Sequence, residues 1–352
     1  MSLSRPLRLL LLLVLALLAL LVVLVYSLTW RPQPREDAPV ACTGQAAQLQ
    51  PGQALKVMTW NVQYLAGKRY VFWYDLPGGD GPDERPSSEA LALTLNEVVR
   101  VLRAEQPDVV LLQELHDNAR ASDHQDQLAL LQARLGDLYP CSSQALYWKA
   151  AFVPHPRILG SVGMKLGTLS RFQIARAERL QLPMLETDLL SRQFQLKRAL
   201  LVSYLPIRGG EELVAINTHF DAFAQGQSTM QRQVQMTDAL LQQLQDAGKT
   251  WVLGGDLNLL PPGQFQRLPE DQRSWYAADS ELRDLARRYP MIPTLQQASG
   301  TEQARWYTHY PNDPAASGPD RTLDYLFYSP RLTPLASQVR QRDTLAISDH
   351  LP

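Results

Sequence analysis

From Leu55 to the end of the chain, short apolar runs typical of β-strands alternate with longer amphipathic stretches typical of helices. Ser88 to Glu105 repeats apolar residues at helical spacing with Ser88 as the N-cap, and Asp108 to Leu112 follows as a buried strand. Gly209-Gly210 between two further apolar runs predicts a hairpin. Helices between strands, together with a hairpin, predict an α/β fold of two mixed β-sheets packed together with helices outside.

The remaining elements are predicted from the same patterns. Strands are expected at residues 55–61, 161–171, 198–205, 212–218, 251–256 and 321–328, and helices at 128–138 and 228–244. The composition, with 20% charged and 45% hydrophobic residues, excludes a disordered chain. A net charge of -1 argues against a general nucleic-acid coat protein. No linker-like break interrupts residues 55–352, which we therefore expect to form one domain.

Ahead of this domain, Leu9 to Leu28 is an uncharged run of mostly Leu, Val and Ala. As a helix it spans about 30 Å, the thickness of a bilayer core. A cleaved signal peptide is the alternative, but its apolar region is shorter and no Ala-x-Ala site follows here. We therefore predict a short cytoplasmic segment at residues 1–8, a transmembrane anchor at 9–28, and a Pro-rich tether without a core of its own at 29–54.

The orientation of this anchor and the state of the cysteines are less constrained. Two arginines precede the run and two follow it, so the positive-inside rule gives a tie. The free α-amino group favours a cytoplasmic N-terminus, which makes this a single-pass membrane protein with an exported domain. Cys42 and Cys141 suit one disulfide in an oxidising compartment. Two unrelated thiols remain the alternative, because sequence spacing does not show proximity.

Polar residues recur where the apolar runs stop. They are Asn61, Gln113-Glu114, Asn217-Thr218-His219, Asp256 with Asn258, Asp324 in an aromatic run, and Ser348-Asp349-His350. Each cluster alone is more often a turn or a solvated surface group. In α/β sheets, however, ligands bind at such strand ends, and six clusters together predict one shared site.

The residue types of these clusters indicate metal-assisted chemistry. Glu114 and Asp349 offer hard carboxylate oxygens and Asn61 adds a neutral one, a set that suits Mg²⁺ or Mn²⁺, whereas zinc would require more His or Cys.

The other polar residues have the chemistry of proton transfer and phosphate binding. His219 and His350 are candidate acid–base or phosphate-binding groups. Asp324 is placed to orient and charge His350, Asp256 to accept a proton from an attacking water, and Asn258 to donate to a phosphate oxygen.

Six motifs in order carry a resemblance to a known family. They are Thr59-Trp60-Asn61-Val62, Leu112-Gln113-Glu114, Asn217-Thr218-His219-Phe220, Gly254-Gly255-Asp256-Leu257-Asn258, Leu323-Asp324-Tyr325 and Ser348-Asp349-His350-Leu351-Pro352. Over residues 55–352 the sequence resembles the endonuclease/exonuclease/phosphatase superfamily, which includes secreted DNase, abasic-site endonucleases, neutral sphingomyelinases and inositol-polyphosphate phosphatases. Its members usually continue into a closing strand, whereas this sequence stops at Pro352, so a truncated chain and a missing edge strand both stay open.

The resemblance implies a four-layer α/β/β/α sandwich that hydrolyses a phosphoester with a metal-activated water. The roles it implies are as follows: Asn61, Glu114 and Asp349 for the metal, His350 paired with Asp324 for the scissile phosphate, His219 for phosphate or the leaving oxygen, Asp256 for the nucleophile, and Asn258 for the transition state.

The family does not determine the substrate. Tyr64, Tyr70, Phe72, Trp73 and Tyr74 are an apolar lip for a lipid or sugar portion, or simply the packing of a long loop. Arg321 is a candidate phosphate clamp, with an ion pair to Asp320 as the alternative.

A membrane anchor and the absence of a basic stripe favour a lipid-headgroup phosphodiester over nucleic acid as the substrate. An exported nuclease and a non-catalytic tethered module that binds a phosphate ligand are the alternatives, and no protein partner is predicted.

Overall fold

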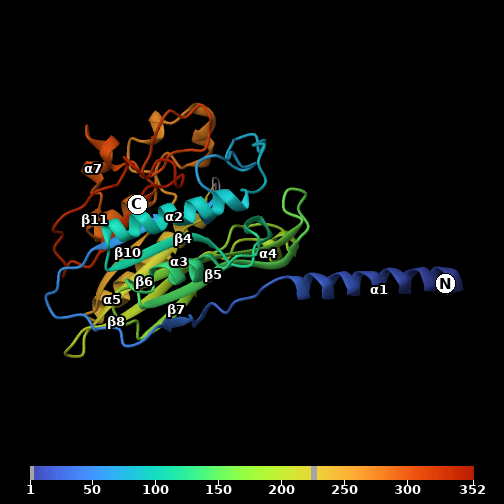
Figure 1. Cartoon of the computed structure of the whole chain (residues 1–352). Helices are drawn as coiled ribbons and strands as arrows, with labels where there is room; N and C mark the ends of the chain where they lie inside the picture. The colour runs from blue at the N-terminus through green and yellow to red at the C-terminus, as the bar shows by residue number, and fades with distance from the viewer. Residues whose placement is uncertain (1–3, 223–227) are drawn as a thin grey trace.

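A computed structural model describes residues 4–222 and 228–352 and contains two mixed β-sheets packed face to face (Figure 1). The larger sheet has the order β1 (Arg35–Asp37), β7 (Arg176–Gln181), β8 (Ala199–Pro206), β9 (Glu212–His219), β10 (Thr250–Asp256), β12 (Asp324–Tyr328), β11 (Met291–Ile292). The smaller sheet has the order β2 (Val40–Cys42), β5 (Cys141–Val153), β6 (Gly160–Ser170), β4 (Val109–His116), β3 (Val57–Asn61). Two pairs, β3 with β4 and β9 with β10, are parallel, and the other pairs are antiparallel.

Helices cover the outer face of each sheet. The smaller sheet carries α2 (Ser88–Glu105) and α3 (Gln127–Leu135), and the larger sheet carries α5 (Thr229–Asp246) and α6 (Leu282–Arg288). The short helices are α4 (Ser191–Phe194) and α7 (Leu295–Ser299), and the 3-10 turns are η1 (Gln63–Leu65), η2 (Arg120–Ser122), η3 (Phe265–Arg267), η4 (Glu270–Trp275) and η5 (Gln303–Trp306). The N-cap of α2 is Ser87, one residue earlier than predicted, and its hydroxyl accepts from the Ala90 amide at 3.1 Å.

Side-chain alternation along the strands creates the layers. In β4, Val110 and Leu112 pack with the helices, while Val109 and Leu111 pack between the sheets. In the larger sheet, β9 and β10 alternate in the same way, so both inner faces share one core. The predicted four-layer α/β/β/α sandwich of two mixed sheets is confirmed.

A glycine lets the two sheets approach where the site forms. A Cβ atom at Gly254 would lie 2.6 Å from a methyl of Leu326 and 2.8 Å from a methyl of Leu111. Real Cβ atoms essentially never lie that close to another carbon, so a larger residue at this point would require the Leu326 and Leu111 side chains to move.

The segment predicted as a free tether, residues 29–54, belongs to the sandwich instead. Its strand β1 pairs with β7 and its strand β2 pairs with β5, so it adds one edge strand to each sheet. Leu49 is only 2% exposed and packs between the sheets. The prolines and scattered charges of this segment suit edge strands, which the sequence pattern does not distinguish from a linker.

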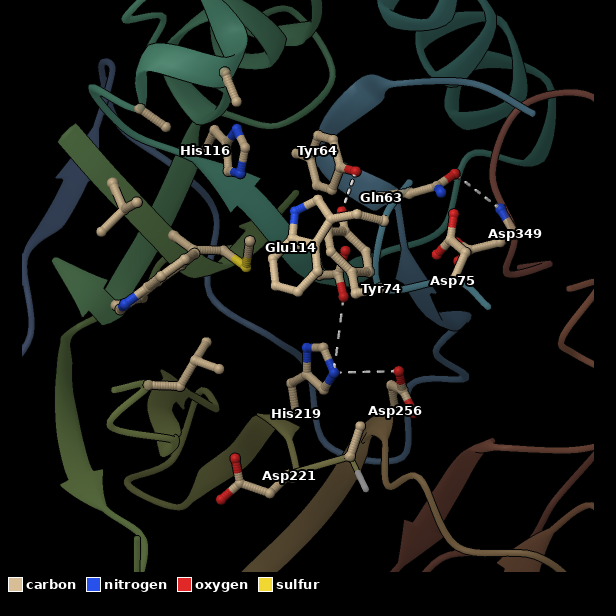
Figure 2. Close-up of a pocket in the computed structure, with 18 of the residues that line it drawn as sticks. Gln63, Tyr64, Tyr74, Asp75, Glu114, His116, His219, Asp221, Asp256 and Asp349 are labelled. Atoms are coloured by element: carbon tan, nitrogen blue, oxygen red, sulfur yellow. Dashed lines mark hydrogen bonds and ion pairs between the residues drawn. The ribbon is translucent and has the colours of Figure 1, made fainter. Parts of the chain in front are cut away.

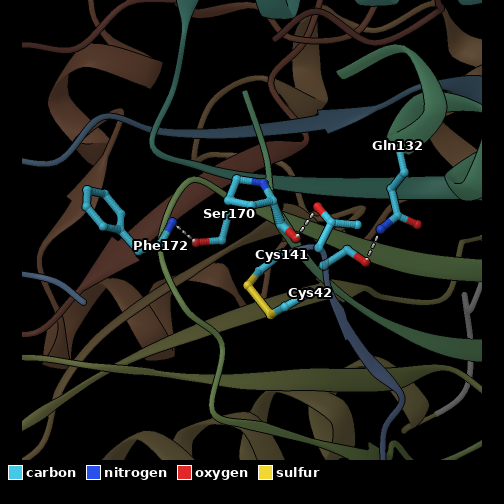
Figure 3. Close-up of a disulfide and its surroundings, with 8 residues drawn as sticks. Cys42, Gln132, Cys141, Ser170 and Phe172 are labelled. Atoms are coloured by element: carbon cyan, nitrogen blue, oxygen red, sulfur yellow. Dashed lines mark hydrogen bonds between the residues drawn. A yellow bond between two sulfur atoms is a disulfide. The ribbon is translucent and has the colours of Figure 1, made fainter. Parts of the chain in front are cut away.

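A disulfide fastens this segment to the smaller sheet. Cys42 in β2 and Cys141 in β5 are direct cross-strand partners, and their sulfurs are bonded (Figure 3). Of the two alternatives left open by the sequence, the structure contains the bridge.

The N-terminal helix α1 (Arg5–Leu28) projects away from the sandwich (Figure 1). It has no buried residue, and its most apolar window has a mean hydropathy of 3.4. By length and composition it is able to cross a membrane, a test that a signal sequence also passes.

Removing the disulfide should destabilise the domain. The bridge closes a loop with a sequence separation of 99 residues, so the paired change Cys42→Ala and Cys141→Ala should lower the free energy of unfolding by about 2–5 kcal/mol. Thermal denaturation with and without reductant measures this, and the double variant, as the control, should not respond to reductant. Equal stability of the two proteins under oxidising conditions would contradict the expectation.

Candidate active site

The strand order brings distant polar residues to one end of the sandwich. Asn61 ends β3, His219 ends β9 and Asp256 ends β10, and β9 and β10 are parallel neighbours in one sheet. The Asn61 amide donates to the Asp256 carboxylate at 3.1 Å across the two sheets. Because β12 runs antiparallel to β10, its first residue, Asp324, lies opposite Asp256.

These residues surround a cavity of about 640 Å³ (Figure 2). Its polar wall contains Glu114, His219, Asp256, Asn258, Asp349 and His350. Asn61 and Asp324 are bonded to this wall through Asp256 and His350. Eight of the nine predicted site residues therefore lie at one location.

His350 in the final segment of the chain pairs with Asp324, the first residue of β12. The His350 Nδ1 atom lies 2.7 Å from Asp324 Oδ2, and Nε2 lies 3.5 Å from Asp256 Oδ2. Burial disfavours the charged imidazole, but Asp324 and Asp256 outweigh it and hold the pKa of His350 well above its usual value. The Trp60 indole donates to the His350 carbonyl at 2.9 Å, which fixes the terminal segment.

The second histidine has the opposite character. Burial lowers the pKa of His219 well below its usual value, and Arg198 and His350 add to the effect. Its Nε2 atom lies 3.3 Å from Asp256 Oδ2, and its Nδ1 atom lies 3.4 Å from the Tyr147 hydroxyl. The site therefore pairs one neutral and one positively charged imidazole around a single carboxylate.

The Glu114 side chain points into the cavity because β4 has a β-bulge at this residue. Its φ of +58° falls where the register of β4 against β6 shifts between Leu112 and Leu115. Such a bulge turns a side chain away from its regular direction, and backbone strain of this kind is often found at functional sites. Burial raises the pKa of Glu114 to about 7, and the neighbouring Asp349 adds to the shift.

The donor set fits a hard divalent cation. Glu114 and Asp349 place two carboxylates close together in a half-buried space, and Asp75 nearby has its pKa raised to about 7 by burial and by Asp349. Both cysteines are in the disulfide, so the wall offers no thiolate, and its charged and polar donors include carboxylate oxygens, amide oxygens and imidazole nitrogens. The Asn61 amide oxygen accepts from the Gln63 amide at 3.0 Å and keeps one lone pair for a cation. Mg²⁺ or Mn²⁺ suits such a set.

Arg321 does not line the cavity. It is fully buried, and its guanidinium makes two 2.7 Å hydrogen bonds to Asp320 and further bonds to Gln272 and Tyr276. With its donors used in this way, the ion pair with Asp320 replaces the phosphate clamp predicted from the sequence.

Other residues of the cavity wall were not singled out from the sequence. Arg198 pairs with Asp221 at 3.3 Å, and after His350 it is a second positive charge that opposes the raised pKa of Glu114. His309 stacks edge-on against His350 with ring centres 4.7 Å apart. Asp75 follows the aromatic loop. An Arg at a strand start and an Asp in a loop have no local signature, so only their spatial neighbours mark them.

The aromatic loop fits both interpretations made from the sequence. Tyr64, Trp73 and Tyr74 line the cavity, which supports a lip, whereas Phe72 is 1% exposed and packs in the core with Tyr70.

Comparison with known proteins agrees with this fold. Residues 58–350 match the family described as the Endonuclease/Exonuclease/phosphatase family. Since the match covers most of the sequence, the chain belongs to that family, whose members are hydrolases of phosphoester bonds and generally use divalent metals. No curated protein matches the sequence.

Solved structures show the same fold at low identity. An endonuclease/exonuclease/phosphatase from Beutenbergia cavernae has a TM-score of 0.55 at 22% identity, covering 84% of this chain and 69% of that one. The human Nocturnin catalytic domain with bound sulfate has 0.50 at 18%, covering 91% and 96%. A family protein from Leptotrichia buccalis has 0.51 at 14%, covering 85% and 97%.

Changing Glu114→Gln should separate stability from metal binding. Loss of the half-buried Glu114 carboxylate relieves its repulsion with Asp349, so the metal-free variant should unfold at a higher temperature than the parent. The affinity for Mg²⁺ or Mn²⁺ should fall by about 10–100-fold or more, measured by isothermal titration calorimetry. Glu302→Gln on the exposed surface, where Glu302 is 71% exposed, is the control and should change neither. Unchanged metal affinity in Glu114→Gln would contradict this assignment.

Proposed function

We propose that this chain is a membrane-anchored, divalent-metal-dependent phosphoesterase that hydrolyses a phosphodiester in a lipid headgroup or a related small phosphoester. One observation carries the proposal: the Asp256 carboxylate lies between neutral His219 and charged His350 in a cavity that also holds the Glu114 and Asp349 carboxylates. This cavity therefore brings together carboxylates that suit a cation, a base for the attacking water and a charged donor for the phosphate.

The side chains have distinct tasks in this proposal. Asp256, held by the Asn61 amide at one oxygen and the Asn258 backbone amide at the other, orients the attacking water and accepts its proton. His350, kept protonated by Asp324, donates to a phosphate oxygen. Asn258 adds a neutral donor where charge develops, and His219 contacts the phosphate or the leaving oxygen.

Glu114 and Asp349, with Asn61, would hold the cation. A bound Mg²⁺ or Mn²⁺ would neutralise phosphate charge and stabilise the transition state as a Lewis acid. The rest of the catalysis is positioning by the protein, as phosphoryl transfer requires.

The cavity wall favours a small or lipid phosphoester over nucleic acid. Away from the polar wall it is lined by apolar side chains, namely Trp73, Trp148, Val153, Ile158, Val162, Met164, Leu185 and Leu196. The arginines at its edge have partners within the protein: Arg85 pairs with Asp123, Arg157 with Glu84 at 3.6 Å, and Arg120 donates to the Ile158 carbonyl at 2.7 Å. A nucleic-acid groove would instead need unpaired basic residues along a strand path.

The proposed location rests on two features. The helix α1 would anchor the chain, and the disulfide is typical of domains on the exported side of a membrane.

Hydrolysis should depend on the metal and on the Asp256 and His350 side chains. The full chain in detergent should cleave bis-p-nitrophenyl phosphate with added Mg²⁺ or Mn²⁺, and EDTA should abolish cleavage. Asp256→Ala and His350→Ala should each reduce kcat at least about 10²–10⁴-fold, because each removes a group that handles a proton or the phosphate charge. His124→Ala, at an exposed histidine outside the cavity, should retain the parent rate. Activity that survives all these changes would rule out the mechanism.

A substrate panel decides the substrate class. We expect the headgroup to be released from sphingomyelin or phosphatidylinositol faster than plasmid DNA is nicked under the same conditions. Faster plasmid nicking would favour the exported nuclease, and metal binding without turnover on any phosphoester would favour the binding module.

A further inference from the structure

The helix α1 is joined to the sandwich without slack. It ends at Leu28, and the next residue, Thr29, already forms an antiparallel bridge with Ala150 in β5. The Arg31 guanidinium donates to the Gln193 side chain of α4 at 3.2 Å. A bilayer crossed by α1 would therefore lie directly against the corner of the domain formed by β5 and α4.

Exposed apolar side chains gather at this corner. Outside α1, the described chain exposes eight large hydrophobic side chains, and four of them belong to segments beside the root of α1. They are Phe152 at the end of β5 (38% exposed), Leu159 before β6 (52%), and Leu189 (82%) and Leu190 (56%) before α4. We call these four residues the root face.

Buried contacts show that the segments of the root face lie together. Ile158, the neighbour of Leu159, packs in one cluster with Trp148 and with Phe194 of α4. The Trp148 indole also donates to the Phe194 carbonyl at 2.7 Å. The exposed tips therefore project from one packed base.

Two exposed arginines, Arg31 and Arg192, lie beside the root face, next to Gln193 and Leu190 of the α4 segment. Burial lowers the pKa of Lys197 to about 8, and the repulsion of Arg31, Arg179 and Arg192 contributes to the shift. Of the acids nearby, Asp188 accepts from the backbone amides of Leu190 and Ser191, and Glu36 lies 3.8 Å from the buried Arg179. Exposed apolar side chains next to the exposed Arg31 and Arg192 match the chemistry of an anionic lipid surface.

We propose that the root face inserts into the headgroup region of the bilayer that α1 crosses. The apolar side of the cavity wall, which contains Trp148 and Ile158, would then lie next to the lipid surface. This inference rests on the membrane anchoring in the proposed function. The same structural elements carry both features: Trp148, Val153 and Ile158 line the cavity, while Phe152 and Leu159 beside them face outward. A lipid would reach the site with little displacement from its leaflet.

Depth-dependent quenching tests the docking directly. The described residues contain no free cysteine, so Leu159→Cys and Leu189→Cys each provide a single labelling site for a fluorophore. The full chain, with its mass showing that α1 is retained, is placed in nanodiscs of phosphatidylcholine and phosphatidylglycerol with brominated acyl chains. Leu335→Cys is the control, because Leu335 is 81% exposed and follows β12 at the opposite end of the sandwich.

The labels at positions 159 and 189 should be quenched several-fold more than the label at position 335. Equal quenching at all three positions would overturn the proposal. The proposal would also be overturned if the fluorescence of the labels at positions 159 and 189 changed only when the protein concentration was raised. A second copy of the protein would then cover the root face.

A kinetic experiment separates this inference from the proposed function. Leu189→Glu with Leu190→Glu should lower turnover of vesicle phospholipid about tenfold or more and leave turnover of bis-p-nitrophenyl phosphate unchanged, because neither residue lines the cavity. If no phosphoester is hydrolysed by the parent, the proposed function fails and the quenching alone decides the docking. If lipid is hydrolysed at the same rate by both proteins, the docking fails and the function stands.

Discussion

The carboxylate of Asp256 is the interaction on which the site depends. It receives the Asn61 amide from the other sheet, lies within 3.5 Å of both His219 and His350, and begins the turn that places Asn258. Burial raises the pKa of Asp256 to about 6, because an ionised carboxylate is less stable in this buried position than in water. Hydrogen-bond donors on every side offset that cost, and they come from both sheets and the C-terminal segment.

A second polar contact holds the sheets in the register that this site needs. The Asn217 amide donates to the Leu112 carbonyl at 3.0 Å and the Gly167 carbonyl at 2.9 Å, and its oxygen accepts from Gln113 at 2.7 Å. Asn217 therefore acts between the layers and not on substrate. The same region carries Gly254, whose missing side chain allows the sheets to approach. Close packing and a fully satisfied buried amide together fix the positions of the strand ends.

The neutral and charged histidines follow from their surroundings. His350 has two carboxylates within 3.5 Å, whereas His219 shares one of them and also feels the positive field of Arg198. The same residue type therefore acquires two protonation states a few ångströms apart. Sites that handle protons depend on such differences between neighbouring groups.

The sequence by itself determined the class of fold, because the period of apolar residues reports which face of each strand or helix is buried. It also located eight of the nine predicted site residues that lie together in the structure. The reason is that ligand sites in α/β folds form at the ends of the strands, and the polar residues that follow apolar runs mark those ends. Only the tertiary structure decided the partner of Arg321, the edge strands within residues 29–54, the disulfide, and the places of Arg198 and Asp75 in the cavity wall. These depend on contacts between segments far apart in the chain, and a local pattern of residues carries no record of such contacts.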